Sequence, residues 1–317
     1  MVITSDRGSN PRTSTIVMPN SMVRMKQYQD EGIEFTKMSG AGNDFVVLDN
    51  RKGVVTDPAA LARELCNRRS GIGADGLLLL ELSDRADFLM RYYNSDGSYG
   101  GMCGNGGRCI SRYAYIKRIV NRPEMRFEAL EHVYSASILT DSVRLRMKNP
   151  LDFRLGQMIK LSQIDLRFHF VNSGSPHCVI FLDENHELGS TLEGLDVPVL
   201  GREIRNHKYF IPDGTNVNFV EKIDARCCAV RTYERGVEEE TLACGTGSVA
   251  VALIANQVKE SMSPISLQVR SGETLTVEFE KTGNTQYENV TLNGSAHVVF
   301  NGKIMYDFSS QSILDIV

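Results

Sequence analysis

Two stretches of the chain share one pattern: Asn94–Cys109 reads NSDGSYGGMCGNGGRC, and Tyr233–Ser248 reads YERGVEEETLACGTGS. Each contains a Cys-Gly-x-Gly motif, at Cys103 and at Cys244, and each motif leads into a stretch that we expect to be helical. A strand-like segment precedes each motif, MRYYN in the first copy and VRTYE in the second. The same parts recur in the same order 140 to 141 residues apart, which indicates an internal duplication.

A second pair of segments supports the duplication. Gly40–Asp49 reads GAGNDFVVLD and Gly174–Asp183 reads GSPHCVIFLD. In each, a glycine turn is followed by a polar residue, Asn43 or His177, and then by an apolar strand that ends in Asp. We therefore expect two similar domains that face each other across a pseudo-two-fold cleft.

The remaining pattern predicts the α+β class. Short apolar or alternating runs bounded by Gly, Asn or Asp predict strands. They cover residues 45–49, 76–82, 88–93, 143–148, 178–183 and 216–220. Helices are predicted from Asp57-Pro58 through residue 68, where Asp is a good N-cap and Pro suits the first helical position, and over residues 108–120 and 248–258. Strands and helices are therefore mixed.

Length and composition limit the function classes. A chain of 317 residues suggests two domains, and its net charge of −4 argues against nucleic acid as a partner. No apolar run is long enough to span a bilayer, so we expect no membrane association. The seven cysteines are odd in number and follow no secretory segment, which favours free thiols and a cytoplasmic location. Without a Cys-x-x-Cys pair we expect no metal site.

The chain divides into four predicted segments. Residues 1–32 are rich in Ser, Thr, Arg, Asn and Met and lack an apolar period, so we expect a disordered leader. Residues 33–147 form the predicted N-terminal domain and residues 148–296 the C-terminal domain. We expect the closing segment, residues 297–317, to return to the N-terminal domain.

The repeated Cys-Gly-x-Gly motif suggests acid–base chemistry. A cysteine at a helix start lies next to the partial positive charge of the helix N-terminus, which favours the thiolate. The glycines let backbone amides approach a carboxylate closely. Two thiols on opposite sides of a carbon can remove a proton from one face and deliver another to the opposite face. This inverts a stereocentre without a cofactor. The other cysteines lie in apolar runs and are expected in the core: Cys66, Cys109, Cys178, Cys227 and Cys228.

At these residues the chain resembles the diaminopimelate epimerases. The similar segments, in family order, are FTKMSGAGNDFVVLDN, RRSGIGADGLLLL, NSDGSYGGMCGNGGRC, NSGSPHCVIF, GTNVNF, YERGVEEETLACGTGS and GSAHVVFNGKI. The resemblance covers nearly everything after residue 32. It implies two pseudo-symmetric domains, each a β-barrel-like sheet around a central helix, with the active site between them.

The resemblance also implies roles for individual residues. Cys103 and Cys244 would be the acid and base, and His177 and Glu234 would tune the thiols or grip the α-ammonium group. The residues expected to bind the substrate are Asn43, Asn94, Gly104, Asn105, Ser175, Asn216, Glu234, Arg235, Gly245 and Thr246. The implied reaction converts LL-2,6-diaminopimelate to the meso isomer in lysine and peptidoglycan precursor synthesis. The resemblance implies that the enzyme needs no cofactor and that it forms a homodimer.

Three departures from the family pattern affect substrate preference rather than the thiol pair. Gly76 stands where some members have Gln, Ser175 stands where many have Asn, and VEEETLA replaces a shorter VGETLA before Cys244. One alternative is therefore another cofactor-free racemase on this scaffold, of the histidine or proline type. A more distant alternative is a redox or metal-binding protein that uses paired cysteines.

Overall fold

A computed structural model describes residues 32–307, 310 and 312–317. The leader expected over residues 1–32 lies outside these residues except for Gly32. The strands are β1 Ile33–Gly40, β2 Asn43–Asp49, β3 Gly76–Glu81, β4 Phe88–Asn94, β5 Glu124–Ala129, β6 His132–Ile138, β7 Ser142–Arg146, β8 Leu151–Lys160, β9 Asp165–Asn172, β10 Pro176–Phe181, β11 Asn216–Lys222, β12 Cys227–Glu234, β13 Glu239–Thr241, β14 Ile265–Gln268, β15 Thr274–Lys281, β16 Tyr287–Ser295, β17 His297–Asp307 and β18 Ser312–Ile316. The helices are α2 Pro58–Cys66, α3 Gly104–Ile116, α4 Val197–Arg205 and α5 Gly245–Val258, with 3-10 turns at Leu182–Glu184, His186–Leu188 and Lys208–Phe210.

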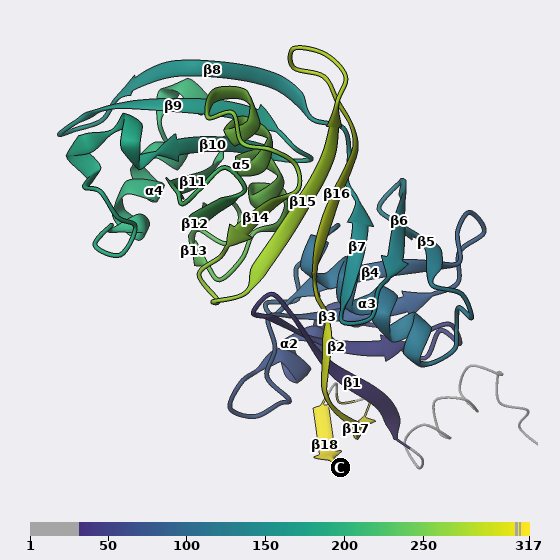
Figure 1. Ribbon diagram of the computed structural model, residues 1–317. Coiled ribbons are helices and arrows are strands. Elements are labelled where there is room, and N and C mark those ends of the chain that lie inside the picture. Colours follow the sequence, from purple (N-terminus) through teal and green to yellow (C-terminus); the bar gives the residue numbers. More distant parts are fainter. Residues whose placement is uncertain (1–31, 308–309, 311) are drawn as a thin grey trace, which may run out of the picture.

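The two halves of the chain repeat one topology (Figure 1). In the first half, β2 and β3 are parallel neighbours connected through α2, β3 pairs antiparallel with β4, and β4 pairs parallel with β5. In the second half, β10 and β11 are connected through α4, β11 pairs antiparallel with β12, and β12 pairs parallel with β14. The predicted duplication and the α+β class are therefore confirmed.

The connecting helices begin with the same chemistry. Asp57 caps α2 by accepting from the Ala60 amide at 3.0 Å, as the sequence predicts. Asp196 caps α4 by accepting from the Val199 amide at 3.1 Å. Each helix also has a proline in its first turn, where a missing N–H costs nothing. Sequence analysis missed α4 although the same signals precede it.

Each half encloses a central helix in strands. Helix α5 is apolar on all sides, and its residues 249–255 are buried against β9–β12, β14 and β15. Helix α3 packs Cys109, Ile110 and Tyr113 into a second core formed with β1–β4, β6 and β7. Of the five cysteines expected in the core, four are buried. Cys227 is only partly buried, because it alternates with the inward-facing Cys228 along β12.

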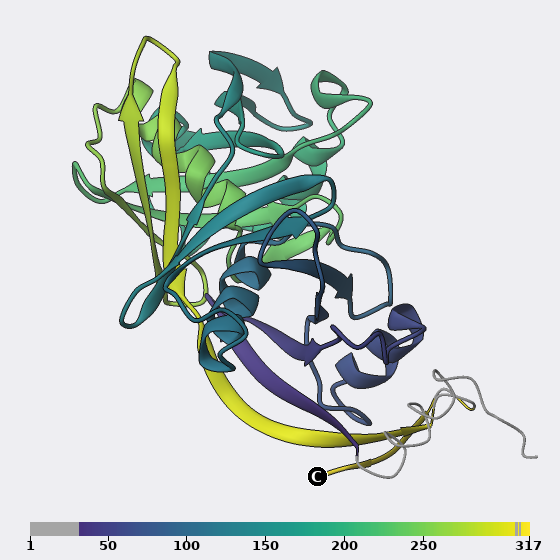
Figure 2. The ribbon, with the colours of Figure 1, turned by 90° about the vertical axis from the view of Figure 1, so that its right-hand side faces the viewer.

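The halves are joined by strands that pass between them. β7 pairs antiparallel with β16, and Figure 1 shows these two strands side by side between the two units. After β16 the chain continues into β17, a long curved strand that pairs with β1 (Figure 2). The predicted domain boundaries at residues 147/148 and 296/297 lie close to these crossings and stay predictions. No helix in the described residues is long and apolar enough to cross a membrane.

Candidate active site

Both repeated cysteines are N-caps of the central helices. The Cys103 Sγ accepts a hydrogen bond from the Gly106 amide at 3.5 Å, and the Cys244 Sγ accepts one from the Gly247 amide at 3.4 Å. An oxygen of Ser, Thr, Asp or Asn usually occupies this position. The helices therefore begin directly after each cysteine, several residues earlier than predicted, and each Cys-Gly-x-Gly motif includes the first helical turn.

The two helix starts are in contact. A Cβ atom added to Gly104 would lie 4.0 Å from the Cα of Gly245, and one added to Gly245 would lie 3.8 Å from the Cα of Gly104. The Asn105 Nδ2 donates to the carbonyl of Ala243, the residue before Cys244, at 3.2 Å. The fold thus brings the two motifs together from opposite halves, and their glycines leave room for this approach.

Burial changes the thiol chemistry from the one expected. Cys244 is buried with 6% of its surface exposed, and Cys103 is half-buried. Burial raises the pKa of both thiols above the ordinary value, while the amides at the helix starts act in the opposite direction. The helix starts therefore favour ionisation of the thiols, as predicted, but the loss of solvent raises the pKa values by more than the amides lower them.

His177 lies fully buried behind Cys244. Its Nε2 lies 2.9 Å from the Thr246 Oγ1, and that hydroxyl lies 3.5 Å from the Cys244 Sγ. Burial lowers the pKa of His177 to about 3, with the charge of Arg235 acting in the same direction. The ring is therefore neutral and acts on the sulfur only through Thr246, which fits the predicted tuning of the thiol better than a grip on an ammonium group.

Asn218, which sequence analysis missed, fixes the tautomer of His177. Its Nδ2 donates to the His177 Nδ1 at 3.1 Å, so the imidazole proton resides on Nε2 and points to Thr246. Its Oδ1 accepts from the Thr232 Oγ1 at 3.1 Å. The sequence signal was a second asparagine two residues after Asn216, on the same face of an otherwise apolar strand.

Ser175 and Asn216 extend the polar network around His177. The Ser175 Oγ lies 3.0 Å from the His177 Nε2 and 3.2 Å from the Thr246 Oγ1. Asn216 donates to the Pro176 carbonyl at 2.8 Å and accepts from the Arg235 amide at 2.9 Å. These residues are therefore together in one cluster, and their predicted role in binding the substrate stays a prediction.

Glu234 interacts with both thiols. The negative charge of Glu234 raises the pKa of Cys103 and of Cys244. Burial raises the pKa of Glu234, and interactions with the Thr241 and Cys244 side chains lower it by less. The neighbouring Arg235 directs its Nη1 to the Asp213 carbonyl at 2.8 Å. Arg235 and Asp213 line a cavity of about 410 Å³. Ionisable groups that shift one another in this way are typical of catalytic sites.

The unusual VEEETLA segment forms a braced turn after Arg235. Glu238, with a left-handed φ of 61°, accepts from the Gly236 amide at 3.0 Å and from the Arg205 Nε at 3.2 Å. The Tyr233 hydroxyl donates to the same carboxylate at 3.4 Å. The carboxylate therefore connects the Arg235 turn to the end of α4.

In the N-terminal half, Asn43 is held from both sides. Its Nδ2 donates to the Asp75 Oδ2 at 3.0 Å, and its Oδ1 accepts from the Asn105 Nδ2. Asn94 behaves differently, since its Nδ2 donates to the Ser98 Oγ at 2.9 Å. No hydrogen bond connects Asn94 with the other predicted residues in the described part of the chain.

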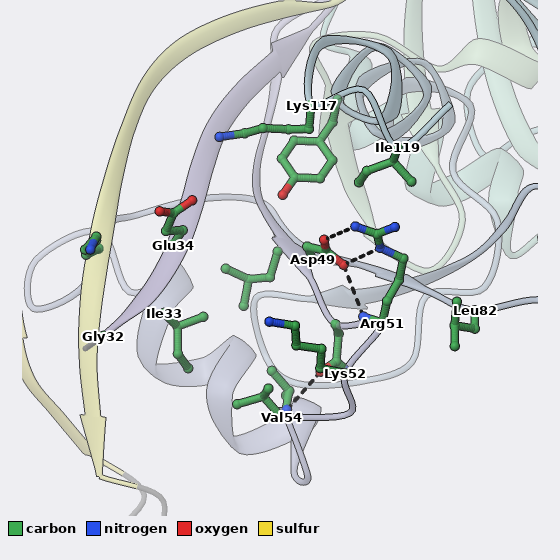
Figure 3. A pocket seen from close by; sticks show the side chains of 15 residues that line it. Gly32, Ile33, Glu34, Asp49, Arg51, Lys52, Val54, Leu82, Lys117 and Ile119 are labelled. Atoms are coloured by element: carbon green, nitrogen blue, oxygen red, sulfur yellow. Dashed lines mark hydrogen bonds and ion pairs between the residues drawn. The ribbon is translucent and has the colours of Figure 1, made fainter. Parts of the chain in front are cut away.

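A larger cavity, of about 820 Å³, lies away from the cysteines. Figure 3 shows Arg51 paired with Asp49 there, with Glu34 and Lys117 on the opposite wall. None of the predicted site residues lines it, and so its size does not make it the candidate site. Within the described residues, no group of three or more His, Cys, Asp or Glu side chains is placed to hold a metal ion.

Comparison with known proteins agrees with this geometry. The sequence profile of the family described as diaminopimelate epimerase matches residues 35–148 and 169–298, which include every predicted site residue. The chain belongs to the diaminopimelate epimerase family. It is 46% identical to the diaminopimelate epimerase of Chlorobaculum tepidum over 84% of this chain and 99% of that protein. It is 38% identical to that of Aquifex aeolicus over 86% of this chain and 98% of that protein.

Solved structures confirm the fold more widely. A probable proline racemase from Agrobacterium radiobacter superposes with a TM-score of 0.65 at 16% identity, over 88% of this chain and 96% of the other. At that identity the likeness shows the fold alone. Membership of the diaminopimelate epimerase family makes this chain an epimerase, and neither the proline-type alternative nor a redox or metal-binding protein is favoured.

Proposed function

We propose that this epimerase converts LL-2,6-diaminopimelate to the meso isomer with two cysteines and no cofactor. The observation that carries the proposal is that Cys103 and Cys244 cap two helices whose first residues touch. A single substrate carbon placed at this contact has a thiol from each half within reach. Symmetric halves suit a reaction in which both faces of one carbon are treated alike.

The proposed proton transfer uses one thiolate and one thiol. The thiolate removes the α-proton from one face, and the thiol on the other side donates its proton to the opposite face, so that the product leaves one thiol and one thiolate with exchanged roles. Because burial disfavours both thiolates, one thiol ionises as the cationic α-ammonium group arrives, and its proton passes to solvent water. The reverse reaction uses the same pair in exchanged order.

The helix starts would bind the α-carboxylate. Backbone amides of Gly104 and Asn105 on one helix, and of Gly245 and Thr246 on the other, belong to the first turns, where amides lack partners within the helix. Removal of the α-proton shifts negative charge onto the carboxylate oxygens, and preorganised amides stabilise that charge. The helix starts therefore lower the free-energy barrier for removal of the weakly acidic α-proton.

The remaining cluster would select the distal end of the substrate. A guanidinium such as that of Arg235 can form two hydrogen bonds to a carboxylate, and Asn43, Asn94, Asn216 and Ser175 offer groups for an amino-acid zwitterion. Glu234 is close enough to both thiols for its charge to raise the pKa of each. The neutral His177 ring would orient Thr246 through its Nε2–H and would not take part in the proton transfer.

A substrate panel tests this proposal. The purified protein is incubated separately with LL-diaminopimelate, L-histidine and L-proline without added cofactor, and chiral chromatography measures inversion. We expect inversion of LL-diaminopimelate with a kcat/KM at least about 100-fold above the others, the discrimination that two lost hydrogen bonds provide. Preferential inversion of histidine or proline would contradict the assigned substrate.

We also propose a cytoplasmic homodimer. All seven cysteines are free, which suits a reducing compartment. Val298, Val299 and Phe300 are consecutive and exposed on β17, and β1 is the only described strand that pairs with this part of β17. Apolar side chains on an unpaired strand edge favour association. Light scattering should give twice the chain mass for the native protein, and Phe300→Asp should shift it toward the monomer; a monomeric native protein would contradict the proposal.

A further inference from the structure

Arg108 is a fully buried charge between the two halves. It lies on α3 just after the Cys103 motif, with 0% of its surface exposed. Its Nη2 donates to the Asn105 Oδ1 at 2.9 Å and its Nε donates to the Ser295 carbonyl at 3.2 Å, while Nη1 has no hydrogen-bond partner in the described residues. Burying a guanidinium with one unpaired donor is costly, which indicates a role beyond packing.

Both partners of Arg108 lead to the other half of the molecule. Asn105, which accepts from Arg108, also donates through its Nδ2 to the carbonyl of Ala243, directly before Cys244. Ser295 is the last residue of β16, at the point where the chain crosses into β17 and returns to β1. The contacts therefore run without a break from the crossing, through Arg108 and Asn105, to the residue that precedes the second thiol.

The surroundings of Arg108 are shaped for a guanidinium. A Cβ atom added to Gly294 would lie 3.0 Å from the Arg108 Cζ and Nε, so a side chain at that position would displace the group. The Ser295 hydroxyl donates to the carboxylate of Glu273 in the C-terminal half. The negative charge of Glu273 also raises the pKa of Arg108, against the larger effect of burial. The corresponding position in the second repeat is Val249, which makes no such contact.

We propose that Arg108 is a positioning residue that sets the alignment of the two thiols across the substrate carbon. It orients Asn105, which ties the start of α3 to the residue before Cys244, and it binds the crossing at Ser295. A planar guanidinium has divergent donors for both acceptors, whereas a lysine ammonium is a compact group that reaches one of them from this buried site. Arg108 thus acts through Asn105 and touches no substrate atom.

This inference rests on the proposed two-thiol function and predicts a specific kinetic defect. Removal of the α-proton and its return to the same face need one thiol, whereas inversion needs both thiols in line. Misalignment therefore favours return over inversion. In deuterated water, return after exchange of the thiol proton gives deuterated LL isomer, and inversion gives meso isomer, so the ratio of the two rates measures the alignment.

The experiment incubates LL-diaminopimelate in deuterated water with the wild type, Arg108→Lys and Arg108→Met, and follows both isomers by mass spectrometry after chiral separation. Arg112→Met is the matched control: Arg112 lies one turn later on α3 and donates to the carbonyls of Leu139 and Thr140 at 3.0 Å each and of Ala296 at 3.4 Å. It therefore shares the contact with the crossing but has no hydrogen bond to Asn105, so the control isolates the Asn105 contact. We expect the exchange-to-inversion ratio to rise about tenfold in both Arg108 variants, a change of about 1.4 kcal/mol in relative barriers. The control should keep the wild-type ratio.

Two results would overturn the inference. One is an unchanged ratio in Arg108→Lys, which keeps the charge and most of the volume and is the variant better suited to fold; the other is an equal rise in Arg112→Met. An effect on folding alone lowers both rates together and leaves the ratio unchanged, and so counts against the inference. If the wild type forms meso isomer without deuterium, the proposed function fails instead, and the variants are not needed to see it.

Discussion

The two helix starts have the same backbone and different neighbours. Cys103 and Cys244 have closely similar N-cap dihedrals, with φ of −116° and −114°, and each sulfur accepts from the amide three residues later. Yet the side chain two residues after the cysteine is Asn105 in one half and Thr246 in the other. A buried guanidinium supports the first, and a neutral imidazole supports the second.

This difference shows that the duplicated halves share the backbone at the helix starts, while different side chains surround each thiol. The positive charge of Arg108 lowers the pKa of Cys103, against the larger effect of burial. Cys244 is more buried, and no cation is among the main influences on its pKa. We therefore expect Cys103 to ionise more readily than Cys244.

The largest expected effect comes from removing either thiol. Cys103→Ala and Cys244→Ala should each lower the rate of inversion by about 10³-fold or more, since each leaves one face without a proton carrier. Chiral chromatography with LL-diaminopimelate measures this. Cys178→Ala, at a buried cysteine on β10, is the control and should keep the activity of the folded protein. Full activity of either Cys103→Ala or Cys244→Ala would contradict a mechanism that needs a thiol on each face of the carbon.

A smaller effect is expected from the group that supports only the second thiol. Thr246→Val removes the hydroxyl that connects His177 with Cys244, and we expect kcat to fall about tenfold, the scale of one oriented hydrogen bond to a charged group. Ser111→Ala, at a buried hydroxyl of α3 with no described hydrogen-bond partner, serves as the control. If Thr246→Val matches the wild type in kcat, Thr246 does not tune the sulfur.

Alkylation compares the two thiols directly. Iodoacetamide should label Cys103 several-fold faster than Cys244, because thiolate is the reactive form and burial suppresses it more at the second site. With both pKa values raised above the usual value, labelling should accelerate about tenfold for each unit of pH between 7 and 9. Peptide mass spectrometry gives both rates. Faster labelling of Cys244, or a plateau below pH 8, would reverse the comparison.

The smallest expected effect is at the Arg235 turn. Glu238→Gln weakens the contacts with Arg205 and the Gly236 amide, and we expect KM to rise about three- to tenfold with kcat nearly unchanged, the cost of about one charged hydrogen bond. Glu239→Gln makes the same charge change at an exposed neighbour and should leave KM unchanged. Equal KM values in the two variants would show that the turn needs no brace.

Much of this arrangement could be predicted from the sequence because it repeats. The repeated Cys-Gly-x-Gly motifs predicted the pairing of the helix starts, and the alternating apolar runs predicted β2, β4, β7 and β11 within a few residues. The helices begin earlier than predicted because cysteine acts as the cap, a position that propensity assigns to oxygen-bearing side chains.

Other features depend on three-dimensional burial, which sequence spacing does not report. The raised thiol pKa values, the neutral state of His177 and the buried charge of Arg108 each follow from loss of solvent at the contact between the halves. Asn94, at the end of β4, donates to the nearby Ser98, a contact that the spacing of the motifs did not predict.

One measurement tests the account most directly. Wild-type protein converts LL-diaminopimelate in deuterated water, and the meso isomer is isolated at less than about a tenth of full conversion for mass spectrometry. Two thiols on opposite faces predict that the inverted carbon carries deuterium from the first turnovers, because the delivered proton comes from a thiol in exchange with solvent. Meso isomer that keeps the original hydrogen would mean that one group carries it between faces, and would contradict the pairing of Cys103 with Cys244.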